Sequence, residues 1–199
     1  MTDIRGYVLA GGKSSRMGSD KALLKIEGLT AIERQIKLLD PFCAQGVFIA
    51  GARTTELMNL SWTVIQDSTL DQGPLIGITS ALQHADHGIA VVLAVDLLAI
   101  DPADITAVLA SCSQDVDSEY DVFFAQSKQD PSEHGAQPLC AAWRVETALP
   151  VLNQQFAEGQ RSVMKAWQGL NRQRVIVDDS RLVNINSPVD FENFRQTKG

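Results

Sequence analysis

The feature that most constrains the fold is the unbroken apolar run Ile89-Ala-Val-Val-Leu-Ala-Val95. A strand of this composition is buried on both faces, as in the middle of a parallel sheet that helices cover. Other β-rich runs lie at 7–10, 47–50, 62–65, 122–125, 139–143 and 175–177. Helical patterns separate many of these runs, which is typical of βαβ units. The sequence therefore predicts an α/β protein built on a mostly parallel sheet.

Three helices are predicted between the strands. Their bounds are 30–40, 76–85 and 103–112. In the first, Ile32, Ile36 and Leu39 share one face, and Thr30 with Glu33 makes a capping box at the start. Each helix is expected to pack its apolar face against the sheet.

Composition limits the class of protein. The chain has 199 residues, of which 45% are hydrophobic and 21% charged, as in ordinary soluble globular proteins. It has no internal repeat and no low-complexity tract. The clearest polar loops, 111–120 and 126–136, need not be domain boundaries. We therefore expect one domain over residues 1–199.

The cysteines and the N-terminus indicate a cytoplasmic protein. Cys43, Cys112 and Cys140 are odd in number and far apart, which favours reduced thiols over a disulfide framework. No apolar run approaches the ~20 residues of a membrane span. The first residues lack the basic region of a secretory signal. We expect no membrane partner.

The charge balance argues against nucleic acid as a partner. The formal net charge is −7 at pH 7, whereas a polyanion-binding protein usually has a basic face. The local basic cluster consists of Lys13, Arg16, Lys21 and Lys25. A single cationic spot on an acidic protein suits a small phosphorylated ligand.

That cluster surrounds the glycine-rich stretch GYVLAGGKSSRMGSDK at residues 6–21. Its Gly12-Lys13 resembles the end of a P-loop, but the first glycine that a P-loop requires is replaced by Tyr7. The dinucleotide pattern G-x-G-x-x-G also fails, because Lys13 stands where a second glycine is needed after Gly11. Adjacent glycines still let backbone N–H groups approach an anion closely. We interpret the loop as a phosphate cradle that is not a P-loop.

Ligands of open α/β sheets bind at the carboxyl ends of the strands, where two aspartates are predicted to lie. Asp67 follows the strand at 62–65, and Asp96 ends the buried strand. Asp96 is suited to a divalent metal, which prefers oxygen ligands and often bridges a carboxylate to phosphates. Each feature alone has a simpler interpretation: a plain Gly-Gly turn, a solvated lysine such as Lys21 paired with Asp20, or an aspartate that caps a helix. Together they favour a triphosphate-plus-metal site.

Other candidate ligands are weaker. His84 and His87 are spaced i, i+3, but no third metal ligand has suitable spacing, so we do not expect a metal site there. His134 lies in a polar loop and is expected to be solvated. Cys140 is expected to be buried in a strand as a small hydrophobic residue.

Several motifs together resemble those of the molybdenum cofactor guanylyltransferases, the MobA-like nucleotidyltransferases. LAGGKSSRMGSDK at 9–21 resembles the family pattern L-A-G-G-x-S-x-R-M-G-x-D-K. QDSTLDQGPLIGITSAL at 66–82 is similar to D-x-x-x-x-x-G-P-L-x-G, and LAVD at 93–96 to the strand end that binds metal. Later matches are QPLCAAWR at 137–144, RSVMKAW at 161–167 and NINSP at 184–188. The resemblance extends over residues 5–195.

The resemblance implies a single-domain, three-layer, Rossmann-like nucleotidyltransferase fold. It also implies transfer of GMP from GTP to the terminal phosphate of molybdopterin or Mo-molybdopterin, with Mg²⁺ as cofactor. The products would be pyrophosphate and the guanine dinucleotide cofactor. Further partners implied are other cofactor-biosynthesis proteins and the recipient molybdoenzymes.

The matching motifs also imply roles for individual residues. Those on the nucleotide side are Leu9, Ala10, Gly11, Gly12, Lys13, Lys21, Asp67 and Asp96. Those with catalytic roles are Lys21, Asp96 and Arg16, with Asp96 as the metal ligand. Those on the pterin side are Gln137, Pro138, Arg161, Asn184 and Asn186. The acceptor phosphate is already an anion, so these residues would align it and neutralise charge rather than supply a strong base.

Two positions depart from the family pattern. Ala50 stands where the family often has an asparagine near the base, and Leu97-Leu98 follows Asp96 where the family usually reaches a proline. These departures leave two alternatives open. One is a related nucleotidyltransferase that uses CTP or a sugar-phosphate acceptor. The other is a degenerate, non-catalytic nucleotide-binding protein.

Overall fold

The computed structural model describes residues 3–10, 21–51, 57, 60–67, 73–113 and 119–196. Within this part, seven strands form one sheet in the order β5-β4-β1-β6-β8-β7-β9. Their bounds are β1 (Ile4–Leu9), β4 (Val47–Ala50), β5 (Val64–Ile65), β6 (Ile89–Ala94), β7 (Val122–Ser127), β8 (Ala136–Arg144) and β9 (Arg172–Val177). Of these strands, β8 alone runs antiparallel to its neighbours. The predicted mostly parallel, mixed sheet is confirmed.

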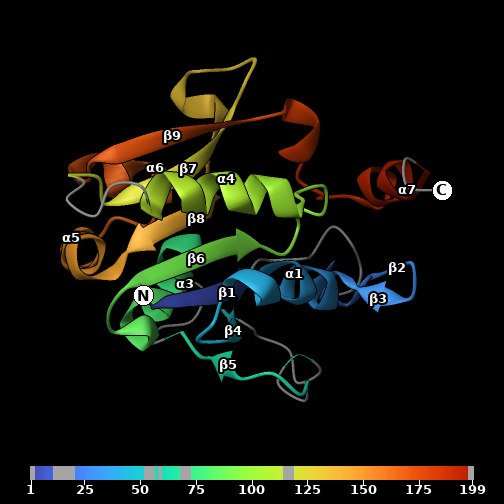
Figure 1. Ribbon diagram of the computed structural model, residues 1–199, viewed down its shortest axis with the longest axis horizontal. Helices are drawn as coiled ribbons and strands as arrows, with labels where there is room; N and C mark the ends of the chain where they lie inside the picture. Colours follow the sequence, from blue (N-terminus) through green and yellow to red (C-terminus); the bar gives the residue numbers. More distant parts are fainter. Residues whose placement is uncertain are drawn as a thin grey trace.

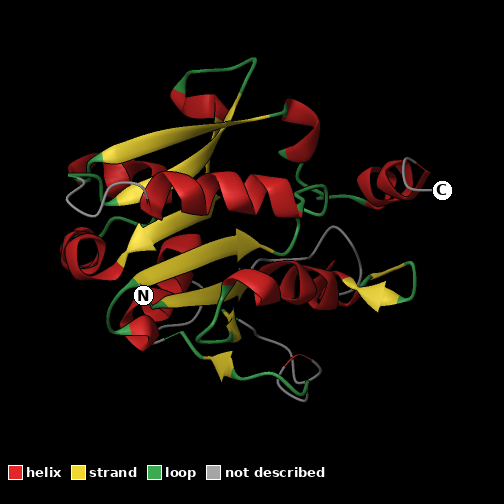
Figure 2. Cartoon of the chain, in the orientation of Figure 1, coloured by secondary structure: helices red, strands yellow, loops and turns green. Residues whose placement is uncertain are grey.

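Helices cover both faces of the sheet, so the fold has three layers (Figures 1 and 2). The helices with apolar residues in one core are α1 (Ala31–Leu39), α4 (Pro102–Ser113) and α7 (Pro188–Gln196). Those with apolar residues in the other core are α3 (Pro74–Ala85), α5 (Val145–Ala157) and α6 (Val163–Ala166). A hairpin of β2 (Lys25–Ile26) and β3 (Leu29–Thr30) precedes α1. The single-domain α/β fold expected from the sequence is thereby confirmed.

Strand β6 lies between the two cores, as its composition predicts. All six of its residues are buried. Val91 and Leu93 belong to the core on the α1 and α4 side, whereas Val92 belongs to the core on the α3 and α5 side. Full burial of a Val or Leu side chain contributes roughly 1.5–3 kcal/mol, so β6 anchors both layers.

The predicted starts of α1 and α4 agree with the structure within one residue, whereas α3 begins at Pro74, two residues earlier than predicted. The capping box forms: Thr30 Oγ1 accepts from the Glu33 backbone N–H at 3.3 Å, and Glu33 Oε2 accepts from the Thr30 backbone N–H at 2.7 Å. Helix α4 continues to Ser113, and β7 continues to Ser127, so both predicted loops begin later than expected. Strand β5 has only two residues, Val64 and Ile65, which pair with Ile49 and Ala50 of β4, so it is shorter than the predicted run 62–65.

None of the helices in the described part of the chain has the length and apolar character that crossing a membrane requires.

Candidate active site

The ends of the central strands meet at one edge of the sheet, on the right in Figure 1. Leu9, the last residue of β1, lies beside Ala94, the last residue of β6. The Val95 backbone N–H then donates to the Leu9 carbonyl at 3.1 Å. The segments that follow β1 and β6 therefore start side by side. Because β8 runs in the opposite direction, its first residues lie toward this edge as well.

Lys21 and Asp96 form an ion pair at this edge. The ammonium nitrogen of Lys21 lies 2.5 Å from Asp96 Oδ2, and the two side chains are 17% and 13% exposed. Lys21 starts the short 3₁₀ helix η1 (Lys21–Leu23), whereas Asp96 follows β6. The surrounding depression is lined by Leu24, Val95, Leu98 and Ile185. The fold thus brings together two residues that the sequence analysis assigned to catalysis.

Asp67, Leu9 and Gly77 are close neighbours. A Cβ atom on Gly77 would lie 3.3 Å from Leu9 Cδ2 and 3.9 Å from Asp67 Oδ1. Gly77 is the last glycine of the segment that resembles D-x-x-x-x-x-G-P-L-x-G, and it lies in α3. Its missing side chain lets α3 approach the end of β1 closely, which brings two predicted nucleotide-binding residues together.

Ala10 and Ala50 are linked through the backbone. The Ala10 N–H donates to the Ala50 carbonyl at 2.9 Å, and both side chains are buried. Ala50 is 0% exposed, so its methyl group forms part of the core on the α3 side rather than a polar contact for a ligand.

Two predicted pterin-side residues flank a backbone hydrogen bond to Asp96. The Ile185 N–H donates to the Asp96 carbonyl at 3.0 Å, and Ile185 is 3% exposed. Asn184 and Asn186 lie on either side of it and are exposed. The structure therefore places these two asparagines next to the turn at residues 94–97, which contains Asp96.

The other predicted pterin-side residues lie further along the same edge. Gln137 and Pro138 belong to the start of β8, and Gln137 pairs with Ala125 of β7. The carbonyl of Arg161 lies 3.6 Å from the position of a Cβ on Gly73, which precedes α3.

The Arg161 guanidinium has local contacts. It donates to the carbonyls of Phe156 at 2.9 Å and Gln160 at 2.8 Å, and it lies 4.1 Å from the Phe156 ring centroid. These contacts hold the side chain against the end of α5. Its predicted role toward a pterin requires it to reach a ligand from this position.

Four predicted residues, Gly11, Gly12, Lys13 and Arg16, lie outside the described residues, as does Asp20. Their assignments stay predictions.

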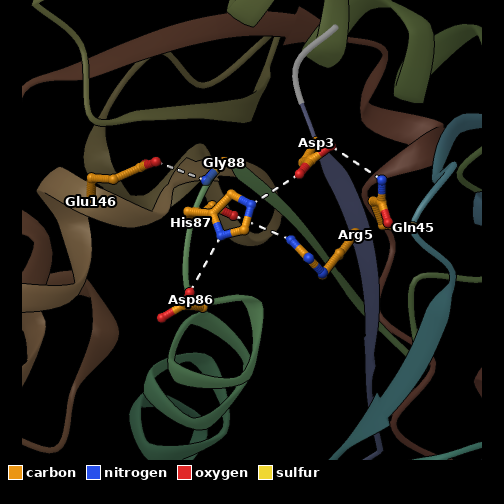
Figure 3. A network of polar contacts seen from close by, with 7 residues as sticks. All are labelled: Asp3, Arg5, Gln45, Asp86, His87, Gly88 and Glu146. Carbon is orange, nitrogen blue, oxygen red and sulfur yellow. Dashed lines mark hydrogen bonds and ion pairs between the residues drawn. The ribbon is translucent and has the colours of Figure 1, made fainter.

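The histidines and cysteines have structural surroundings. His84 Nδ1 lies 2.9 Å from the Tyr7 hydroxyl, and burial lowers the pKa of His84. His87 lies at the opposite edge of the sheet, between Asp3 and Asp86 (Figure 3). The exposure of His134 and the burial of Cys140 agree with prediction.

The cysteines are unreactive in this environment. All three are buried free thiols. Burial raises the pKa of Cys43 and of Cys140 to about 12, so both remain protonated near neutral pH.

The residues at Asp96 fit a hard divalent cation that shares its ligands with a substrate. Among the described residues, no group of three His, Cys, Asp or Glu side chains could enclose a metal ion. Mg²⁺ does not need such a cage, because it commonly keeps several waters and takes one or two carboxylates together with substrate phosphates. The ammonium of Lys21 already lies against the Asp96 carboxylate, so a positive charge is accommodated at this position.

Comparison with known proteins first identifies the class: the chain is a nucleotidyltransferase. It belongs to the family described as the MobA-like NTP transferase domain, whose model matches residues 6–174. A probable molybdenum cofactor guanylyltransferase from Opitutus terrae is 30% identical, and the alignment covers 97% of this chain and 95% of that protein.

Two solved structures have the same fold. Molybdopterin-guanine dinucleotide biosynthesis protein A from Archaeoglobus fulgidus has a TM-score of 0.77 at 21% identity, covering 98% of both chains. A Mycobacterium tuberculosis H37Rv protein, solved as a complex with manganese, has a TM-score of 0.71 at 14% identity and covers 98% of this chain and 100% of its own. At these identities the likeness establishes the fold alone.

Proposed function

We propose that this nucleotidyltransferase transfers GMP from GTP to the terminal phosphate of molybdopterin or Mo-molybdopterin. The products are pyrophosphate and the guanine dinucleotide cofactor. The observation that carries the proposal is the Lys21–Asp96 pair at the carboxyl edge of the sheet, in a chain that is similar over 97% of its length to a probable molybdenum cofactor guanylyltransferase. Its expected setting is the cytoplasm, and its expected protein partners are other cofactor-biosynthesis proteins and recipient molybdoenzymes.

The nucleotide is proposed to bind along the end of β1. The residues assigned to it are Leu9, Ala10, Gly11, Gly12, Lys13, Lys21, Asp67 and Asp96. Gly77 lies close to both Leu9 and Asp67. This closeness supports the assignment, because it brings two of the proposed nucleotide-binding residues together.

Asp96 is the proposed ligand of a divalent cation, taken to be Mg²⁺. When bound, such an ion supplies positive charge against phosphate oxygens. The manganese complex of a protein with the same fold agrees with a divalent ion as the cofactor. The ammonium of Lys21 contacts the Asp96 carboxylate. On its flexible side chain it can also reach phosphate oxygens bound beside that carboxylate.

The residues on this edge need to align the acceptor phosphate and neutralise negative charge. They need not supply a strong base, because the acceptor phosphate is already an anion. Lys21 is proposed to neutralise charge that develops on the leaving pyrophosphate, together with Lys13 or Arg16. The aligned acceptor approaches from the side of Asn184, Asn186 and Arg161, with Gln137 and Pro138 nearby. Such alignment lowers the entropic part of the activation barrier.

One observation leaves CTP as an alternative nucleotide substrate. Ala50 is fully buried and offers no side-chain amide to a base. A related enzyme that accepts CTP therefore stays as the alternative for the nucleotide, and a sugar phosphate in place of the pterin stays as the alternative for the acceptor.

The proposal is tested by incubating the protein with GTP, Mg²⁺ and molybdopterin and measuring pyrophosphate together with the dinucleotide by mass spectrometry. We expect pyrophosphate release that requires both substrates. Release with a sugar phosphate instead of molybdopterin supports the alternative acceptor. Nucleotide binding without turnover on either acceptor would contradict the proposal.

A further inference from the structure

A buried glutamine contacts the turn that carries Asp96 from the side of α1. Gln35 is 2% exposed and lies among apolar residues of α1, including Ile32 and Ile36. Burying a carboxamide costs free energy unless hydrogen bonds compensate it. Gln35 Nε2 donates to the Leu97 carbonyl at 2.8 Å and lies 3.3 Å from the Ala94 carbonyl, which it also contacts as a donor. The buried amide is therefore used to bind this turn.

The two carbonyls that Gln35 contacts are the ones that define the turn. The Leu97 N–H donates to the Ala94 carbonyl, and the Ile100 N–H donates to the Leu97 carbonyl, each at 3.3 Å. Both of these turn bonds are long for N–H···O hydrogen bonds. Asp96 lies between the two acceptors, so a single amide group ties together the backbone before and after the carboxylate.

A second side chain holds the far end of the same segment. Arg181 Nη1 donates to the Ala99 carbonyl at 3.2 Å, and Nη2 lies 2.6 Å from Asp101 Oδ2. Arg181 belongs to the 3₁₀ helix η5 (Asp179–Arg181), which is far from α1 in sequence. Residues 97 and 98 are leucines, so no proline ring restricts φ there, and these hydrogen bonds must supply the restraint.

We propose that Gln35 is a positioning residue, which fixes the Asp96 carboxylate in the orientation that receives the divalent cation, and that Arg181 is the outer part of the same clamp. The inference rests on the function proposed above, because it concerns the carboxylate assigned to the metal. Residues that orient a metal ligand from behind commonly change metal affinity when they are removed.

The chain offers a matched control in Gln126. It is 1% exposed, and its Nε2 donates to the carbonyls of Asp130 and Ser132 in the loop after β7. Gln35→Met and Gln126→Met each keep the length of the side chain and remove two hydrogen bonds to backbone. A loss of stability common to both variants is thus separated from an effect on Asp96.

The first measurement is hydrogen exchange of the peptide that contains residues 94–101, followed by mass spectrometry. We expect faster exchange in Gln35→Met and unchanged exchange in Gln126→Met. Arg181→Ala, at a side chain that is 35% exposed, provides a second variant if Gln35→Met does not fold, and it should also exchange faster there. Wild-type exchange of this peptide in the folded Gln35 and Arg181 variants would overturn the proposed clamp.

The second measurement is binding of Mn²⁺ alone, followed by the electron paramagnetic resonance of the free ion, in wild type, Asp96→Asn and both methionine variants. We expect Gln35→Met to raise the Kd by about tenfold or more and Gln126→Met to leave it unchanged. If Asp96→Asn weakens binding but Gln35→Met does not, the positioning role is wrong. If Asp96→Asn binds Mn²⁺ as tightly as wild type, the metal assignment of the proposed function is wrong, and hydrogen exchange still decides whether Gln35 holds the turn.

Discussion

The ammonium of Lys21 lies 2.5 Å from the carboxylate of Asp96, and this contact joins the segment after β1 to the end of β6. Each charge partly satisfies the other in a site where both side chains are mostly buried. Removal of either residue therefore leaves its partner with an uncompensated charge, which is costly in such surroundings. A variant of either residue therefore also changes the electrostatic surroundings of the other.

Asp96→Asn should abolish most turnover. A neutral amide is a poor ligand for a hard cation, and the substitution also removes the partner of Lys21. The Asp96 side chain belongs to the site rather than to either core, so the fold should be kept. Pyrophosphate release measured against Mg²⁺ concentration provides the test. An active variant with the magnesium dependence of wild type would exclude Asp96 as the metal ligand.

Lys21→Ala should lower kcat by about a hundredfold, on the order of 3 kcal/mol, if the ammonium stabilises charge in the transition state. An ordinary surface ion pair is worth only about 0–1 kcal/mol. Lys21→Arg should restore part of the activity, because a guanidinium does not occupy the same point as an ammonium.

The control for Lys21 is Lys37→Ala, since Lys37 is an exposed lysine in the last turn of α1 and lies outside the basic cluster. Steady-state kinetics at saturating GTP should give wild-type kcat for this variant. A Lys21→Ala enzyme that also stays within about threefold of wild type would mean that its ammonium has no part in the chemistry.

Gly77→Ala should weaken nucleotide binding and lower the free energy of unfolding by about 0–2 kcal/mol. The new methyl group would lie 3.3 Å from Leu9 Cδ2, which displaces the end of β1 or the Leu9 side chain. Overpacking of this kind costs about 1–3 kcal/mol, and replacing glycine inside a helix returns up to about 1 kcal/mol. We expect a KM for GTP raised severalfold.

Gly169→Ala is the matched control for Gly77→Ala. Its Cβ would lie 3.2 Å from Val151 Cγ1, a similarly tight contact in a part of the chain without predicted site residues. If both variants change the KM for GTP equally, Gly77 has no special relation to the nucleotide.

The contact of His87 with Asp3 should make stability depend on pH. The two are 2.9 Å apart (Figure 3). The hydrogen bond to Asp3, and a weaker one to Asp86, raise the pKa of His87 above 6.5, although Arg5 opposes the shift. A raised pKa stabilises the fold below 6.5, and this contribution is lost as pH rises through the folded-state value.

Asp3 sets the acidic limit of the same contact. The hydrogen bond from His87 lowers the pKa of Asp3 below 3.8, so its contribution needs pH above 3.8 and is lost as pH falls through the folded-state value. The difference in Tm between wild type and His87→Gln should therefore be larger near pH 5.5 than near pH 8.5. His134→Gln, at an exposed position in the 3₁₀ helix η3 (Glu133–Gly135), is the histidine variant for comparison. An equal difference at both pH values would mean that this pair does not stabilise the fold.

Much of this architecture follows from local patterns. The apolar run of β6 predicts a strand with two covered faces, and Thr30 with Glu33 predicts the start of α1. Asp96 could be predicted as a site residue because it follows the buried strand. Helix α5, in contrast, contains Pro150, which interrupts the helical pattern, so this helix was not predicted from the sequence.

The support around the site could not be predicted in the same way. Gln35 lies on the apolar face of α1, so periodicity marks it as an unusual buried polar residue. The carbonyls that it binds are 59 and 62 residues away in sequence, and no local pattern identifies them. The pairing of Lys21 with Asp96, 75 residues apart, likewise depends on how the ends of β1 and β6 meet.

The most direct test of the proposed function is a side-by-side assay of GTP and CTP with molybdopterin and Mg²⁺. Each reaction is followed by pyrophosphate release and by the mass of the dinucleotide product. We expect a clear preference in kcat/KM for GTP, with molybdopterin guanine dinucleotide as the product. A kcat/KM for CTP that equals or exceeds the value for GTP would contradict the guanylyltransferase assignment.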